Sequence, residues 1–113
     1  MVDFKDGQLL RIFVNEDDTW HGTRLYDALV ETLKREHVAG ASVFRGIEGF
    51  GAHREIHVAK VWKPGGRLPV LIEVVDDPET IEALLPRLEA MIGEGAITLE
   101  KVRYRRYVRG RDA

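Results

Sequence analysis

The sequence contains no cysteine. This absence excludes a disulfide framework, a thiolate nucleophile and any zinc or iron–sulfur site built on thiolates. The chain also lacks an apolar run approaching the roughly 18 residues that a membrane-spanning helix needs. Its first residues, Met1–Asp6, do not show the basic and then apolar pattern of a signal peptide. We therefore expect a cytoplasmic protein.

Neither sign of charge dominates: 17 Lys and Arg face 19 Asp and Glu, for a net charge of −2. The molecule as a whole has no basic field, so we expect no binding of nucleic acid. The length of 113 residues, with 44% hydrophobic and 32% charged residues, predicts a single globular domain over residues 1–113. The charge is uneven, however, because five of the nine residues from 103 to 111 are arginine. A local anion site is possible there.

Apolar periodicity predicts the first two elements. Residues 9–14 form a short apolar, β-rich run that predicts a strand. Leucine then recurs every fourth residue from Leu25 to Leu33, which predicts a core-facing helix over 22–37 with Gly40 as its stop.

Three further apolar runs predict strands at 41–45, 56–62 and 70–75. The Pro-Gly-Gly break at 64–66 suggests that the last two of these runs pair as a hairpin. Glu73 interrupts the third run, where an unpaired buried carboxylate would be costly. We therefore expect Glu73 to have a partner, either an arginine or the glycine-rich loop.

The second helix has a clear predicted start, with Asp77 as the cap of its first-turn amides and Pro78 at its first position. Pro86 falls inside the apolar stripe that runs from residue 81 to 92, which predicts a kink or an early break. A last strand from Ile97 shifts its apolar phase near Glu100–Lys101, which predicts a bulge.

The order strand, helix, strand, strand, helix, strand predicts an α+β fold of the ferredoxin-like βαββαβ type. In this sandwich, two helices cover one face of an antiparallel sheet. The fold hosts many functions, so function has to be argued from the candidate sites.

Two features of the second half fit an anion. The turn Gly93–Glu94–Gly95 can aim several backbone N–H groups at one point, although it can equally be a plain helix stop. Strand alternation places Arg103 and Arg105 on one face, where forked guanidinium groups can bind phosphate. The alternative for these arginines is a charged sheet edge that prevents aggregation.

A glycine-rich loop follows the strand at 41–45. Gly46, Gly49 and Gly51 permit tight backbone turns, but no Lys-Ser/Thr pair follows them, so this is not a P-loop.

His53 and His57 have the spacing of a metalloprotease His pair. The acidic residue between them, Glu55, is one place too late to act as the general base, and no third ligand is evident. We therefore expect no metal site.

The second half resembles the PII signalling family. Residues 72–77, the helix after them and residues 92–97 are similar to that family's strand, helix and phosphate-binding "IGDGKI" turn. Residues 44–51, 56–57 and 85–86 resemble the PII-like subfamily called domain of unknown function 190.

The resemblance covers about residues 8–108. It implies a homotrimer that binds an adenine nucleotide (AMP, ADP or ATP) between subunits and has no obligatory cofactor. It also implies a regulatory protein, not an enzyme, that contacts a membrane transporter or an enzyme through the loop after strand two. Two alternatives remain: an accessory module of a fluoride exporter without nucleotide sensing, and an enzyme that uses His53 or His57.

The resemblance also assigns residues, position by position. Those that match the nucleotide site are Gly46, Gly49, Gly51, Gly93, Glu94, Gly95, Arg103 and Arg105. Those in the loop that meets the partner are Phe50, His53, Arg54 and His57. Ala96 stands where the PII turn has a lysine, and the loop is shorter than its PII counterpart.

Overall fold

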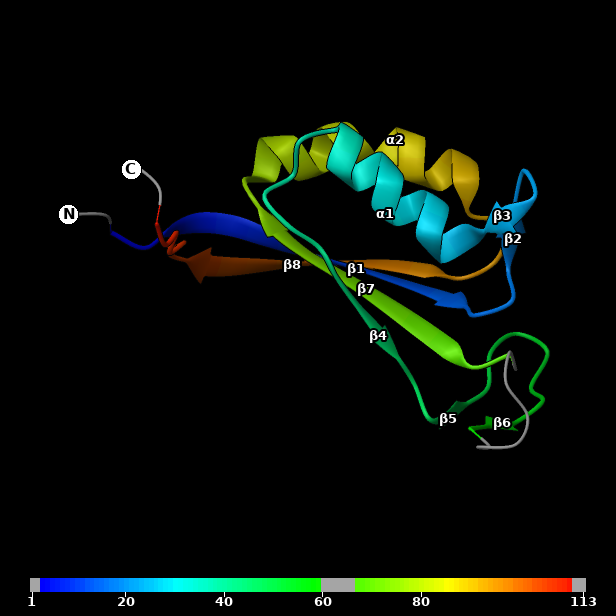
Figure 1. Cartoon of the computed structure of the whole chain (residues 1–113). Helices are drawn as coiled ribbons and strands as arrows, with labels where there is room; N and C mark the ends of the chain where they lie inside the picture. The colour runs from blue at the N-terminus through cyan, green and yellow to red at the C-terminus, as the bar shows by residue number, and fades with distance from the viewer. Residues whose placement is uncertain (1–2, 60–66, 111–113) are drawn as a thin grey trace.

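A computed structural model of the chain describes residues 3–59 and 67–110, and it consists of two layers (Figure 1). The elements are β1 (Lys5–Asn15), β2 (Thr19–Trp20), β3 (Thr23–Arg24), α1 (Leu25–Arg35), β4 (Ser42–Arg45), β5 (Glu48–Gly49), β6 (His57–Val58), β7 (Pro69–Asp76), α2 (Pro78–Met91) and β8 (Ala96–Tyr104). An antiparallel sheet of order β4-β7-β1-β8 lies beneath both helices. The predicted ferredoxin-like α+β fold is confirmed.

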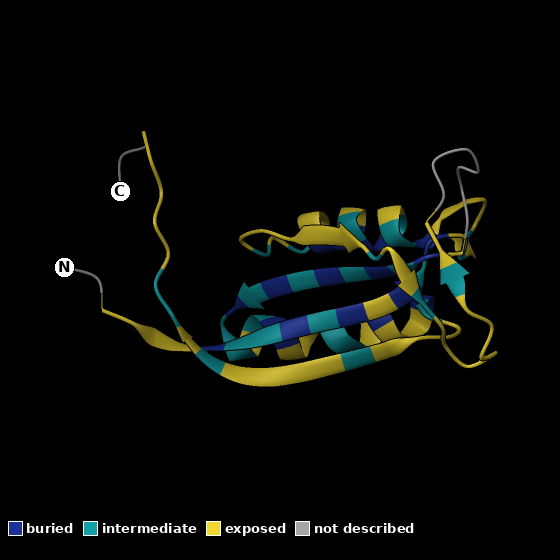
Figure 2. Ribbon diagram, turned by 90° about the horizontal axis from the view of Figure 1, so that it is seen from below, coloured by how far each residue is buried: buried dark blue, intermediate teal, exposed yellow. Residues whose placement is uncertain are grey.

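The core lies between the sheet and the helices. From Leu10 to Val14 in β1, and along the whole of β7, every second residue is buried, as Figure 2 shows, because one face of each strand meets α1 and α2. The buried apolar side chains include Leu10, Ile12, Val14, Ile72, Val74, Leu25, Leu29, Leu33, Ile81, Leu84 and Leu88. Each contributes roughly 1.5–3 kcal/mol by leaving water, so this layer contact is the main stabilising feature of the fold.

The first helix is shorter than the predicted range 22–37. Its start is delayed because β2 and β3 form a tight hairpin around His21 and Gly22, which have φ angles of 48° and 82°. It ends at Arg35, and His37, two residues further on with a φ of 66°, closes a Schellman pair of backbone hydrogen bonds. Gly40 is therefore not the helix stop.

The predicted hairpin of strands 56–62 and 70–75 is wrong in the part that the structure describes. β6 pairs with β5 in a small separate sheet, whereas β7 pairs with β1 and β4. Alternating apolar residues give a strand its period but do not select its partner. The end of the first predicted strand and the Pro-Gly-Gly break lie outside the described residues.

The predicted bulge at Glu100–Lys101 is also wrong, because the register of β8 against β1 is continuous. Ile97 and Leu99 lie opposite helix-facing residues of β1, whereas Val102 lies opposite Gly7 on the other face. The apolar positions thus change from one face of a regular strand to the other.

The start of α2 is confirmed, but Asp77 does not cap it with its side chain. The carboxylate of Asp77 instead accepts a 2.7 Å hydrogen bond from the hydroxyl of Tyr104 and lies 3.3 Å from Nζ of Lys5. These contacts, the Tyr104 hydrogen bond first, hold the pKa of Asp77 below its ordinary value of 3.8. The side chain therefore ties the end of β8 to the start of α2.

Pro86 does not break α2, which continues to Met91. A proline inside a helix costs about 3 kcal/mol. Leu84 and Leu88, on either side of it, are both buried and contribute a comparable or larger amount together. The burial of these two leucines therefore outweighs the cost of a proline inside the helix.

Candidate functional site

The turn between α2 and β8 is built on Gly95. This residue has a φ of 146°, and a Cβ atom placed on it would lie 2.3 Å from the carbonyl oxygen of Phe13. Only glycine fits such a close backbone approach. A Cβ on Gly93 would meet nothing within 4 Å, so Gly93 is not required by packing.

The predicted partner loop lies directly on this turn. Nε2 of His53 is 3.0 Å from Oε1 of Glu94. Gly51 and Ala52 from the loop line a cleft of about 290 Å³ together with Glu94 and Gly95. The remaining walls come from the end of β1 and the start of β8, namely Phe13, Val14, Asn15 and Ala96. The two predicted segments thus form one site within a single chain.

Sequence reasoning missed the contribution of Asn15 to this site. Asn15 ends β1 and lines the cleft by the turn, as well as a smaller hollow of about 60 Å³ inside the loop. Asparagine at a strand end is a common turn residue, so its local sequence carried no signal for a site.

Gly46 and Gly49 lie at the base of the loop, and Gly49 also lines the hollow of about 60 Å³ that Glu94 of the glycine turn borders. The N–H of Gly46 donates a 2.7 Å hydrogen bond to the carbonyl of Pro69. Cβ atoms on these two glycines would lie 2.6 Å and 3.0 Å from Cγ of Pro69. In this chain, both glycines allow the loop base to pack on the start of β7.

A partly buried ion pair fixes the same base from the other side. Glu16, only 7% exposed, accepts hydrogen bonds of 2.7 Å and 3.2 Å from the guanidinium group of Arg45. Such a two-pronged pair has a defined geometry. No local sequence signal pointed to this role of Glu16, because its partner lies 29 residues along the chain.

Arg103 and Arg105 lie at the opposite end of β8 from the turn. Arg103 borders a separate cleft of about 380 Å³ with Lys101 and Pro78, and the guanidinium of Arg105 lies 4.5 Å from the ring centroid of Phe4. A strand rises about 3.3 Å per residue, so Arg103 is roughly 26 Å from Gly95. The turn and the arginines of one chain cannot bind the same phosphate group.

The other predicted loop residues make local contacts only. Arg54, with a φ of 58°, places its guanidinium 5.4 Å from the ring centroid of Phe50. His57 pairs with Gly49 through the backbone of β6. Among the four predicted partner-loop residues, His53 alone forms a side-chain hydrogen bond outside the loop to the part of the chain that the structure describes.

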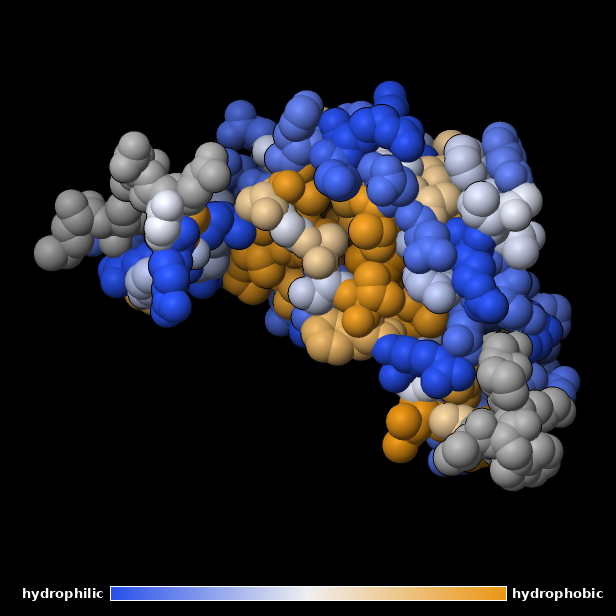
Figure 3. Space-filling model, viewed as in Figure 1, coloured by the Kyte–Doolittle hydropathy of each residue, from blue (hydrophilic) through white to orange (hydrophobic). Residues whose placement is uncertain are grey.

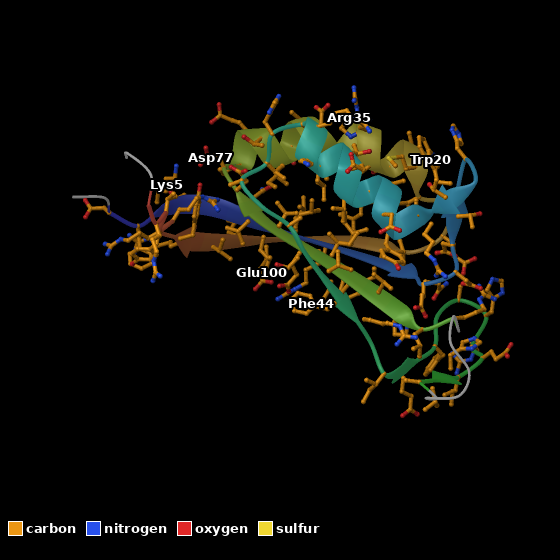
Figure 4. All side chains as sticks on the ribbon, viewed as in Figure 1. Lys5, Trp20, Arg35, Phe44, Asp77 and Glu100 are labelled. Carbon is orange, nitrogen blue, oxygen red and sulfur yellow. The ribbon has the colours of Figure 1, made fainter. Side chains whose placement is uncertain are left out.

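The open face of the sheet, away from the helices, carries large apolar side chains. Phe13 and Phe44 lie on either side of Leu71 on this face and are 40% and 50% exposed. Figure 3 shows hydrophobic side chains gathered below α1, over β4 and the neighbouring sheet, and Figure 4 shows Phe44 on the side away from the helices. Such a contiguous patch is typical of an interaction surface.

One charged cluster interrupts the open face. Arg11 donates hydrogen bonds of 2.8 Å to Glu73 and 3.1 Å to Glu100, and the bond to Glu73 raises the pKa of Arg11. The prediction that Glu73 pairs with an arginine or the glycine loop is confirmed, with Arg11 as the partner. Two carboxylates share one guanidinium, so the cluster carries a net negative charge.

Within residues 3–59 and 67–110, no group of three or more His, Asp or Glu side chains is arranged to hold a metal ion. Neither α1 nor α2, the helices of this same part of the chain, is long and apolar enough to cross a membrane.

The fold is ferredoxin-like, with the glycine turn and the loop side by side at one end of the sheet. Residues 7–104 match the model of the family called domain of unknown function 190, described as "Uncharacterized ACR, COG1993". The chain belongs to this family. A UPF0166 protein of Aquifex aeolicus is 39% identical over 95 residues, which cover 84% of this chain and 90% of the relative. Another, from Methanocaldococcus jannaschii, is 34% identical over 92 residues, which cover 81% and 84%.

Two solved structures share the fold. CPII from Thiomonas intermedia K12, bound to ADP and bicarbonate, has a TM-score of 0.63 at 15% identity and covers 94% of this chain and 95% of its own. A protein from Thermus thermophilus, described as PII-like and signaling, has a TM-score of 0.64 at 19% identity and covers 91% and 93%. The predicted resemblance to the PII-like family is confirmed.

Proposed function

We propose that this protein is a PII-like regulator that binds an adenine nucleotide between the subunits of a homotrimer. The observation that carries the proposal is the roughly 26 Å between the glycine turn and the arginines of the same chain. Both features suit phosphate, through converging backbone N–H groups and through forked guanidinium groups. They can act on one ligand only if they come from different subunits.

The open sheet face supports the trimer. Its apolar residues, Phe13, Phe44 and Leu71, lie together on the face that the helices leave uncovered. Burying such a face against a second and third copy removes apolar surface from water, at about 25 cal/mol per Å².

The ligand class rests on the chemistry of the site and on the fold shared with CPII, which was crystallised with ADP. We infer a regulatory role without catalysis, in which the loop at residues 46–57 reports the nucleotide to a partner such as a membrane transporter. An association with a fluoride exporter stays a prediction.

The test is a calorimetric titration with AMP, ADP, ATP and cyclic dinucleotides, after light scattering has measured the oligomer's mass. We expect one adenine nucleotide to bind, with a thermal midpoint several degrees higher at 100 times its dissociation constant, where the ligand contributes about 2.7 kcal/mol. R103A should weaken binding by about tenfold or more, because a hydrogen bond to a charged group is lost.

Arg35, an exposed arginine on α1, supplies the matched control. R35A removes the same charge far from the turn and from β8, and it should leave the affinity unchanged. A protein of trimer mass that binds none of these nucleotides would show that the relationship to PII-like proteins extends to the fold alone.

A further inference from the structure

We propose that His53 and Glu94 form a latch that holds the partner loop on the glycine turn, and that a nucleotide at the turn releases the loop by displacing this contact. The inference rests on the proposed function, because it assumes that the turn binds a phosphate group. It adds the specific contact through which occupancy of the turn reaches the loop.

The loop tip has few other attachments. Between residues 50–57 and the rest of the described chain, the His53–Glu94 contact is the only side-chain hydrogen bond. Two further contacts lie within the tip: the N–H of Arg54 donates to the carbonyl of Gly51 at 2.8 Å, and the Arg54 guanidinium lies over Phe50. At the end of the tip, His57 pairs with Gly49 through the backbone of β6 and β5. The position of the tip on the turn therefore depends strongly on this one pair.

The contact also occupies the place where a phosphate would bind. Glu94 is the middle residue of the turn, and Gly51 and Ala52 line the same cleft as Gly95. The cleft measures about 290 Å³ and the hollow inside the loop about 60 Å³. Pockets for small-molecule ligands span about 300–1,000 Å³. A nucleotide that reaches the turn backbone therefore shares this space with the loop.

Charge repulsion between Glu94 and a phosphate also favours displacement of the loop. The carboxylate of Glu94 is turned to the loop by His53, and a phosphate placed on the turn would add a second negative charge within a few ångströms. The ligand and the latched loop therefore compete for the turn. A ligand with different affinities for the two loop positions shifts their populations.

The pair is exposed, with 68% of the His53 side chain and 43% of the Glu94 side chain accessible. Exposed pairs have small interaction energies, so we expect the latch to change the ratio of closed to open loop by about two- to fivefold. A weak latch of this kind can be opened by a ligand of ordinary affinity.

The experiment compares wild type, E94A and E89A. Glu89 is an exposed acid on α2, so E89A removes the same group from another part of the surface and is the matched control. The first readout is the rate of trypsin cleavage after Arg54, at the loop tip. The second is ADP affinity by calorimetry, measured also for H53A.

We expect E94A to be cleaved at Arg54 about two to five times faster than wild type, and E89A to match wild type. ADP should accelerate cleavage of wild type. Both E94A and H53A should bind ADP about two to five times more tightly, because no latch has to be broken.

Unchanged cleavage in E94A, slower cleavage of wild type with ADP, or weaker ADP binding by both variants would each overturn the latch. Weaker binding would mean that the contact belongs to the bound state. If wild type binds no nucleotide at all, the proposed function fails, and so does the proposal that a nucleotide releases the loop. The cleavage rates without nucleotide then still show separately whether the pair holds the loop.

Discussion

Replacing Gly95 with alanine is expected to lower the free energy of unfolding by about 3 kcal/mol or more, whereas the same change at Gly93 should cost nothing. At Gly95 the added Cβ would lie 2.3 Å from the carbonyl oxygen of Phe13, and the φ of 146° disfavours any L side chain. A strained φ costs about 1–3 kcal/mol and overpacking about 1–3 kcal/mol more. The obstacle is backbone, which cannot move aside as a flexible side chain can.

Gly93 is two residues away, and its Cβ would meet nothing within 4 Å. Alanine there reduces the freedom of the unfolded chain and can stabilise by about 0.4–1 kcal/mol. Urea unfolding of G93A and G95A measures both effects on one turn. Equal stability of the two variants would contradict the geometry of the turn. Because G95A should destabilise the fold, phosphate binding is better tested by changing Gly93 than Gly95.

Placing a carboxylate on the open sheet face should convert the proposed trimer to monomers. In F44D, the charge would be buried at the subunit interface without a partner, at a cost of several kcal/mol per subunit. Phe44 is half exposed in a single subunit, so the fold itself should survive. Light scattering should give a mass near 12.9 kDa instead of about 39 kDa, the mass of three chains. Circular dichroism should be unchanged.

Phe50 provides the matched control for this change. It is also a phenylalanine, 58% exposed, but it lies on the partner loop between β5 and β6 and not on the open sheet face. F50D should keep the trimer mass. A trimer that persists in F44D would mean that the subunits meet through another surface.

The sequence was most informative where local chemistry decides the structure. Asp77 and Pro78 predicted the start of α2, and the leucine stripes predicted the helix-covered core. The position of Glu73 in an apolar strand predicted a partner for its carboxylate, because an unpaired carboxylate there would be costly. Arg11 is that partner. These inferences use a residue's own preference or the cost of leaving it unpaired.

The sequence was least informative where distant segments meet. His53 and Glu94 are 41 residues apart, and no local preference encodes their contact. The prediction that residues 56–62 pair with residues 70–75 failed for the same reason. The alternation of apolar residues in a strand does not determine which strand it pairs with, and β6 pairs with β5. The separation of Arg103 from the glycine turn became evident only when β8 was seen to be one continuous strand.

In the proposed site, one nucleotide is bound by the glycine turn of one subunit and the arginines of another. Subunit mixing tests it directly. G93V should lose binding because a side chain blocks the turn, and R103A/R105A should lose it because the cations are absent. In a random equal mixture, about a quarter of the interfaces of a cyclic trimer receive an intact turn from one chain and intact arginines from the next.

The measurement is ADP binding by calorimetry to each variant alone and to the two after subunit exchange. We expect little binding by either variant alone and recovery of about a quarter of the sites in the mixture. No recovery in mixed trimers, or binding like wild type by either variant alone, would contradict it.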